Sequence, residues 1–322
     1  MINTRHMKHL LHKLAFASTT AIMLLASTSW AGTYILPPEG TDLFGEVFTI
    51  KANEEDTLLD IGRRYGVGFN EMKSANPTVD MWVPGKDTKV TIPTQFILPP
   101  GPREGVVVNI AEMRIYYYPK PQKGEAPKVT TFPVSVGRMD WNTPLGETKI
   151  IAKVKDPAWY PPQSIRDEHE ADGDPLPRRV PPGPDNPLGQ YAMRLGIPGY
   201  LIHGTNKPQG LGMRVTHGCI RMYPEDIEYF FSIVPKGTKV RLINAPYKAG
   251  WLMDQLYLEA HELLEEDEVE HTAFSNYEPL VDAVARATEY RVEKIDRFAI
   301  KRASNEKTGV PQLISRSSAT IR

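Results

Sequence analysis

A histidine, His203, precedes the only cysteine of the chain, Cys219, by a short stretch of sequence. A thiolate is the strongest side-chain nucleophile at neutral pH, but a free cysteine has a pKa of about 8.5 and needs a cationic or proton-accepting neighbour. Apolar residues 199–202 predict a strand that ends at His203, and Gly218 allows a tight turn beside Cys219. The pattern therefore predicts a base on a strand that faces a nucleophile on a turn.

Other interpretations of these residues stay open. A lone cysteine is most often a small buried hydrophobic residue, and a lone histidine is more often structural than catalytic. A zinc site generally takes four ligands, and Cys219 has no second cysteine to share the ion. His217 is a second candidate base, but the side chains of adjacent residues usually diverge, which favours His203. We expect no metal and no cofactor.

The first 31 residues have the pattern of a secretory signal peptide. A positive start is followed by a short apolar run at residues 14–26 and by the small residues Ser29 and Ala31 at a cleavage site. An uncleaved membrane anchor is the alternative, but the run falls short of a span of about 20 apolar residues. We expect a mature protein that begins near Gly32 and works outside the cytoplasm, where an unpaired cysteine is a candidate reactive group.

Residues 48–93 predict a small strand–helix–helix–strand unit. Leu58, Ile61 and Tyr65 lie on one face of its first helix, and Asn76-Pro77 ends the second helix. Residues 94–104 are rich in proline and predict a stiff linker to the next domain.

Residues 105–245 predict a mostly β domain with the short strands of a sandwich. Its expected strands lie at residues 106–110, 113–118, 130–136, 147–153, 200–203 and 239–243. One helix is expected at residues 224–233, where Pro224 suits the first helical position. Residues 156–189 are rich in Pro, Gly, Asp and Arg, and we expect a long loop that covers the active site as a lid.

Residues 246–322 predict a helical C-terminal extension that ends in a polar tail. Leu252, Leu256 and Leu263 mark one face of a first expected helix. Leu280 and Val284 lie along a second, and the weakly ordered tail is expected from about residue 303. This part of the chain contains no motif that indicates a function.

Together, His203-Gly204-Thr205 and the motif Thr216-His217-Gly218-Cys219 resemble the active-site motif of the YkuD-type L,D-transpeptidases. The resemblance extends to residues 134–138, 143–146 and 182–189 and downstream to residue 240. It implies a YkuD-type β-sandwich in the periplasm that acts on the tetrapeptide stems of peptidoglycan. Cys219 would form a thioester at diaminopimelate, release D-alanine and pass the acyl group to an amine.

The resemblance leaves the acyl acceptor open. It allows a second stem, giving a 3→3 crosslink, or a lysine of an outer-membrane lipoprotein. Water as the acceptor would make the enzyme an L,D-carboxypeptidase. A protein that only binds the cell wall is the alternative from another functional class. The formal net charge of −1 gives no drive toward nucleic acid, so we expect no nucleic-acid partner.

The resemblance also implies roles for single residues. His203 would be the base, the carbonyl of Gly204 would orient its ring, and the amides around Gly218 and Cys219 would form an oxyanion hole. Arg221 has the fork that binds a carboxylate, although a plain surface salt bridge is its structural alternative. The expected substrate-binding residues are Arg221, Thr216, Asn206, Tyr191 and Arg194.

The unit at residues 48–93 resembles a LysM domain, a module that binds the glycan of peptidoglycan. A simple packing module is the alternative for this unit.

Overall fold

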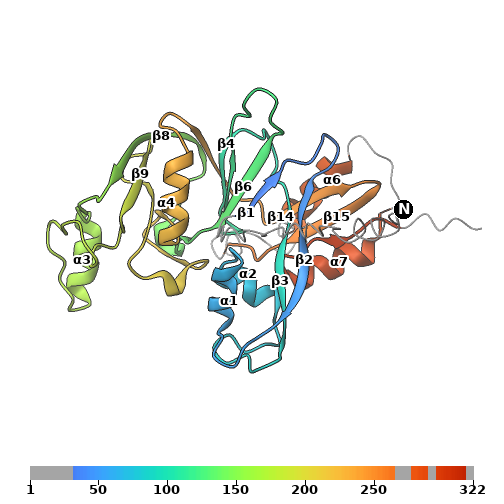
Figure 1. The fold of residues 1–322 in the computed structure, drawn as a ribbon, viewed down its shortest axis with the longest axis horizontal. Coiled ribbons are helices and arrows are strands. Elements are labelled where there is room, and N and C mark those ends of the chain that lie inside the picture. Colours follow the sequence, from blue (N-terminus) through green and yellow to red (C-terminus); the bar gives the residue numbers. More distant parts are fainter. Residues whose placement is uncertain (1–31, 265–276, 289–294, 317–322) are drawn as a thin grey trace, which may run out of the picture.

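The computed structural model describes residues 32–264, 277–288 and 295–316, so the expected signal peptide lies outside the described residues. A mixed sheet of nine strands dominates this part of the chain, in the order β1-β6-β5-β4-β13-β8-β9-β10-β12 (Figure 1). These strands are β1 (Gly32–Ile35), β4 (Gly105–Asn109), β5 (Arg114–Tyr118), β6 (Lys128–Pro133), β8 (Gly146–Lys155), β9 (Tyr191–Leu195), β10 (Leu201–His203), β12 (Ile220–Arg221) and β13 (Lys239–Ile243).

The expected strand-rich region at residues 105–245 is confirmed, but the expected sandwich is wrong because the strands join into one curled sheet. The sheet bends at strand β8, which pairs with a different neighbour along each part of its length. Its first part, residues 146–149, pairs with β13, and residues 150–155 pair with β9, with a register shift between Ile150 and Ala152. An irregularity of this kind bends a strand and strengthens its twist, so one long strand serves both halves of the sheet.

Helix α4 (Pro224–Ile233) covers the concave side of this sheet and confirms the expected helix. Its apolar face buries Ile227 and Phe230 against the sheet residues Phe132 and Met193. Burial of each such side chain contributes roughly 1.5–3 kcal/mol to stability. This packing fixes the wall of the sheet that carries β9 and β10.

The strand–helix–helix–strand order is confirmed as a βααβ unit of residues 43–97 with a small core of its own. It consists of β2 (Leu43–Lys51), α1 (Leu58–Arg64), α2 (Phe69–Ala75) and β3 (Lys89–Ile97). The outer strands pair antiparallel along their whole length. Because β3 continues to Ile97, the connection to the nine-stranded sheet is shorter than the expected linker at residues 94–104.

The C-terminal unit corrects the expectation of a helical extension. Its first part is a hairpin of β14 (Tyr247–Leu252) and β15 (Gln255–Ala260), whereas we expected a helix through Leu252 and Leu256. The hairpin packs against β2 and β3. Strand formation depends on such packing neighbours, which the spacing of leucines along the sequence does not reveal. Helix α6 (Glu278–Thr288) is the expected second helix.

The expected weak tail is also wrong as far as the chain is described. Helix α7 (Arg297–Glu306) continues past residue 303, and β16 (Gln312–Leu313) adds a third strand to the hairpin. Ile314 is fully buried, so this end of the chain belongs to the core of the unit. The acidic run at residues 265–268 and the last residues, 317–322, lie outside the described residues.

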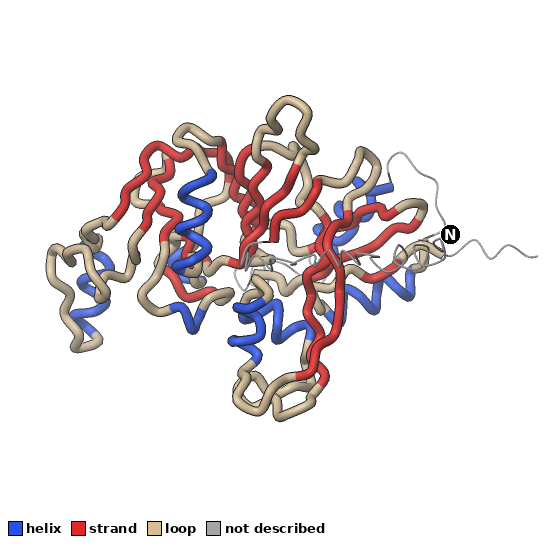
Figure 2. Tube along the Cα trace, in the orientation of Figure 1, coloured by secondary structure: helices blue, strands red, loops and turns tan. Residues whose placement is uncertain are grey.

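Residues 156–189 are more ordered than the loop we expected. They contain α3 (Gln163–Ala171) and a bridge between Trp159 and Val180. The buried side chain of Asn186 closes the segment by donating to the carbonyl of Pro157 at 2.8 Å. Figure 2 shows α3 at one end of the molecule and the C-terminal unit at the other.

None of the helices in the described ranges is both long and apolar enough to cross a membrane.

Candidate active site

Two short parallel strands bring the predicted base and nucleophile together. In the pairing of β10 with β12, Ile202 lies beside Ile220 and His203 beside Arg221. Both isoleucines point into the core, and alternate side chains of a strand point to opposite faces. Accordingly, Leu201, His203, Cys219 and Arg221 all line one pocket.

Cys219, the predicted nucleophile, lies directly after a turn that is held from two sides. Gly218 has a φ of +92°, and a Cβ there would lie 2.8 Å from the ring of Tyr200, so only glycine fits. The hydroxyl of Thr143 donates to the carbonyl of Gly218 at 2.9 Å, and Thr216 donates to the carbonyl of Cys219 at 2.6 Å. These bonds leave the position of Cys219 little freedom.

The thiol of Cys219 is partly exposed and donates to the carbonyl of Gly199 at 3.7 Å. Desolvation by the surrounding protein raises the pKa of Cys219, while a backbone hydrogen bond from Leu201 and the charge of Arg221 act in the opposite direction. Because the thiolate is the reactive form, a nucleophilic role for Cys219 requires a neighbouring group that takes the thiol proton.

His203 is buried at the end of β10, and its ring orientation is fixed. Its Nδ1 lies 2.7 Å from the carbonyl oxygen of Gly204. Because that oxygen only accepts, Nδ1 carries the proton and Nε2 holds the lone pair of a base. Burial and the positive charge of Arg221 lower the pKa of His203 to about 3, although backbone hydrogen bonds to Gly204 and Leu188 oppose the shift. The imidazole is neutral at physiological pH.

His217 contacts a side chain, whereas His203 contacts a backbone carbonyl. Its Nε2 lies 3.0 Å from a carboxylate oxygen of Glu168 on α3, and its ring packs edge-on against Trp141 with centroids 5.0 Å apart. The other oxygen of Glu168 accepts from Arg138. Burial lowers the pKa of His217, and Glu168 partly offsets this effect. The ring nitrogen that faces Glu168 is thus already engaged.

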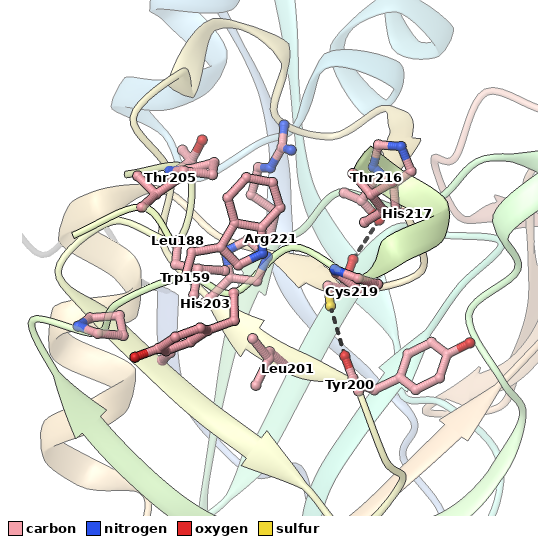
Figure 3. A pocket seen from close by; sticks show the side chains of 18 of the residues that line it. Trp159, Leu188, Tyr200, Leu201, His203, Thr205, Thr216, His217, Cys219 and Arg221 are labelled. Atoms are coloured by element: carbon pink, nitrogen blue, oxygen red, sulfur yellow. Dashed lines mark hydrogen bonds between the residues drawn. The ribbon is translucent and has the colours of Figure 1, made fainter. Parts of the chain in front are cut away.

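The pocket has a volume of about 940 Å³, a size that suits a drug-sized ligand or larger. Figure 3 shows His203, Trp159 and Leu188 on one side in this view and Thr216, His217 and Cys219 on the other. Residues 157–188 supply much of one wall. The expected lid segment therefore lies over the pocket in this structure.

Four of the five expected substrate-binding residues line the pocket, namely Arg221, Thr216, Asn206 and Arg194. The structure does not bring Tyr191 there. Its ring lies in the core, against Phe231, and its hydroxyl donates to Glu228 at 2.9 Å. Tyr191 occupies the face of β9 opposite to Arg194, because successive side chains of a strand alternate. Only its carbonyl reaches the site region, where it accepts from the amide of Gly204 at 3.1 Å.

Sequence reasoning missed several residues that shape the site. Thr143 and Glu168 hold Gly218 and His217, and Lys207 adds a cation to the pocket wall. Thr143 lies within a segment that carried the family resemblance, so a signal existed for it. Glu168 lies in a segment with no motif, and only its place on α3 connects it with the site.

A group of metal-ligand types lies elsewhere in the described part of the chain. Glu112, Glu259 and His261 are buried together, but the ammonium of Lys248 lies 2.9 Å from Glu112 and 2.7 Å from Glu259. This cation already pairs with both carboxylates, so the group is a buried ion-pair cluster.

Comparisons with known proteins identify the family of the chain. Residues 103–242 match the family model of the YkuD L,D-transpeptidase catalytic domain. The chain is 44% identical to "Probable L,D-transpeptidase YcfS" of Escherichia coli over 78% of this chain and 77% of that one. It is 38% identical to "Probable L,D-transpeptidase ErfK/SrfK" of the same species over 92% and 96% of the two chains.

The chain belongs to the YkuD-type L,D-transpeptidases. A solved L,D-transpeptidase from Mycobacterium smegmatis is 21% identical over 47% of this chain and 62% of that one, with a TM-score of 0.33. The family confirms the resemblance seen in the sequence. In the present chain, the residues that match the family model run from β4 to β13 and include both His203 and Cys219.

Proposed function

We propose that this L,D-transpeptidase acts on the tetrapeptide stems of peptidoglycan with Cys219 as its nucleophile. The sulfur attacks the carbonyl of the third stem residue, the bond to the terminal D-alanine breaks, and a thioester forms. An amine then attacks the thioester and regenerates the thiol. The observation that carries the proposal is the placement of Cys219 and His203 in one pocket by adjacent parallel strands.

His203 is the better candidate base of the two histidines. Its Nδ1 proton is committed to Gly204, which leaves Nε2 to take the thiol proton, whereas Nε2 of His217 faces Glu168. A neutral imidazole beside a neutral thiol can accept the proton during attack and return it to the leaving amine. The turn at Gly218 supports an oxyanion hole formed by the amides around Gly218 and Cys219.

Cations in the pocket wall support recognition of an acidic stem. Arg194, Lys207 and Arg221 line the pocket, and the Nε of Arg221 is buried without a hydrogen-bond partner among the described residues. A carboxylate would satisfy such a group, because guanidinium and carboxylate pair in a fork. Thr216 and Asn206 also line the wall and complete the proposed binding set.

Intact-mass spectrometry of the mature protein with a purified disaccharide-tetrapeptide tests the donor reaction. We expect the protein to gain the mass of the stem less D-alanine and to release D-alanine. Cys219→Ala should show neither change. Absence of both changes in the wild type would remove the chemical basis of the proposal.

The acceptor is tested in the same reaction. Adding a second stem or a lysine-terminated peptide of an outer-membrane lipoprotein should discharge the thioester. Crosslinked dimers identify the stem as acceptor, stems carrying the peptide identify the lipoprotein, and free tripeptide stems identify a carboxypeptidase.

We also propose that the βααβ unit is a LysM-like module that binds glycan and that the enzyme works in the periplasm. The order of its elements and its antiparallel outer strands support this assignment. Its tip exposes Trp82 and Val83, whose amides both donate to Asp80 at 2.8 Å. An exposed aromatic ring on a fixed loop suits stacking on a sugar. Trp82→Ala should weaken sedimentation with insoluble cell wall while leaving the reaction with a soluble stem unchanged.

A further inference from the structure

The loop that separates His203 from Cys219 contacts the βααβ unit through its backbone. The amide of Phe69 donates to the carbonyl of Leu211 at 3.0 Å, and the amide of Asn70 donates to the carbonyl of Gly212 at 3.1 Å. Gly212 has a φ of +83°, and a Cβ there would lie 2.3 Å from the nitrogen of Phe69. The two backbones therefore approach so closely that only glycine fits between them.

The other side of the same loop is fixed by the catalytic domain. The buried hydroxyl of Ser135 accepts from the amides of Gly212 at 3.1 Å and Met213 at 3.4 Å, and it donates to the carbonyl of Gly210 at 3.2 Å. The backbone of Ser135 also exchanges two hydrogen bonds of 2.9 Å with Arg221. The loop is thus held between the βααβ unit and the strand that follows Cys219.

The βααβ unit is itself locked in place by ion pairs with the catalytic domain. Glu71 on α2 forms a bidentate pair with Arg114 on β5 at 2.7 and 2.8 Å, and both side chains are buried. Burial alone would lower the pKa of Arg114, but Glu71 keeps it above its ordinary value. Arg63 on α1 forms a second bidentate pair with Glu225 on α4, at 2.7 and 2.9 Å. Separating the buried pair would leave two desolvated charges, which strongly opposes movement of the unit.

The held loop leads directly into the catalytic motif. Residues Leu211 and Gly212 precede β11 (Arg214–Thr216), which pairs with β7 (Val136–Gly137). Thr216, the last residue of β11, holds the carbonyl of Cys219. A shift of the loop would therefore move β11 and, through Thr216, the backbone of Cys219.

We infer that the βααβ unit is a positioning element of the transpeptidase site, acting through the amides of Phe69 and Asn70 on the loop at residues 210–213. This role rests on Cys219 as the proposed nucleophile and is separate from glycan binding. A misplacement of about 1 Å at a reacting centre can lower a rate by roughly 100-fold. The unit thus contributes to turnover even on a substrate that carries no glycan.

Gly212→Ala, which forces the two backbones apart, tests the inference on a soluble stem peptide without sugar. Gly237→Ala is the matched control, since Gly237 has a φ of +89° and a Cβ added there would meet no heavy atom within 4 Å. We expect Gly212→Ala to lower kcat about ten-fold or more with KM within about three-fold of the wild type. Gly237→Ala should keep the kcat of the wild type. Equal kcat in both variants, or a loss by Gly212→Ala on polymeric wall alone, would overturn the inference and leave the unit as a tether.

A second variant keeps the test decisive if Gly212→Ala does not fold. Arg63→Gln removes the pair with Glu225 without introducing a clash, and Lys51→Gln removes an exposed pair with Asp87 elsewhere on the same unit. Hydrogen exchange of residues 210–216 should be faster in Arg63→Gln than in Lys51→Gln, with a matching fall in kcat. Unchanged exchange and kcat would contradict a positioning role. Since exchange needs no activity, failure of the proposed chemistry in the wild type remains distinguishable from failure of this inference.

Discussion

At the scale of single residues, burial disfavours the charged forms of both the proposed nucleophile and the proposed base. Burial raises the pKa of Cys219 and lowers that of His203 to about 3. Arg221 lies beside both and shifts both pKa values downward. These directions favour a neutral thiol and a neutral imidazole, so in the proposed mechanism the proton moves during the attack on the substrate.

The two histidines should differ sharply when each is removed. His203→Ala should lower the rate of thioester formation by about 10²- to 10⁴-fold, because a general base contributes on that scale. His217→Ala should retain measurable turnover, since that ring holds Glu168. Stopped reactions followed by intact mass measure both rates. Loss of acylation in His217→Ala with turnover kept in His203→Ala would exchange their roles.

The buried neutral His203 should also make stability depend on pH. A histidine whose pKa is lower in the folded than in the unfolded chain stabilises the fold above the unfolded value and loses that contribution as pH falls. The window runs from the ordinary value of 6.5 down to about 3. Within it the wild type should lose roughly 1.4 kcal/mol of unfolding free energy per pH unit more than His203→Gln. Urea unfolding at pH 7 and pH 4.5 measures the difference, and parallel losses in the two proteins would contradict the assignment.

At the scale of elements, α3 is connected to the catalytic motif by one carboxylate. Glu168 accepts from Arg138, which follows β7, and from His217, which follows β11. The pair with Arg138 is partly exposed, so each contact is worth at most about 1 kcal/mol. Together they hold the helix over the pocket wall that residues 157–188 supply.

Glu168→Gln should loosen this segment without unfolding it. We expect KM for the stem to rise by up to about five-fold, with a melting temperature close to that of the wild type, because surface pairs contribute little to stability. Glu170→Gln, an exposed position of the same helix, is the control. Identical kinetics of the two variants would show that the contacts of Glu168 do not affect substrate binding.

At the scale of the whole molecule, one buried lysine joins the three units. Lys248 on β14 donates to the carbonyl of Ile97 on β3 at 2.8 Å and to the hydroxyl of Tyr116 on β5 at 3.1 Å. It also pairs with Glu112 and Glu259. Burial would raise the pKa of Glu112, but Lys248 and His261 keep it below its ordinary value. The charges of Lys248, Glu112 and Glu259 therefore join the C-terminal unit to the catalytic domain, and the backbone of Ile97 ties the βααβ unit to the same cluster.

Lys248→Met should therefore destabilise the whole protein. Removing the cation takes the ammonium away from two buried carboxylates, and breaking a buried ion pair in this way typically costs about 3–5 kcal/mol. Lys239→Met, which removes an exposed pair with Glu104, should leave the melting temperature close to that of the wild type. Thermal unfolding measures both, and similar melting temperatures of the two variants would contradict a structural role for the cluster.

The sequence by itself determined the features that depend on residue type and short spacing. The nucleophile and base motif, the helix at residues 224–233 and the order of the βααβ unit all follow from local patterns. The family resemblance, carried by short motifs at residues 203–205 and 216–219, is confirmed by the family model that matches residues 103–242. These features can be predicted from the sequence because they depend mainly on residues that are close together in the chain.

Only the tertiary structure decided the features that depend on distant partners. Residues 247–260 form strands because β2 and β3 offer a packing surface, although their leucines also fit a helical face. Tyr191 points away from the pocket because strand register fixes its face. Burial lowers the pKa of His203. The contact of Glu168 with His217, and the contact of the βααβ unit with the loop at residues 210–213, join residues that are far apart in sequence. Such interactions form only when the chain has folded, so no local pattern could specify them.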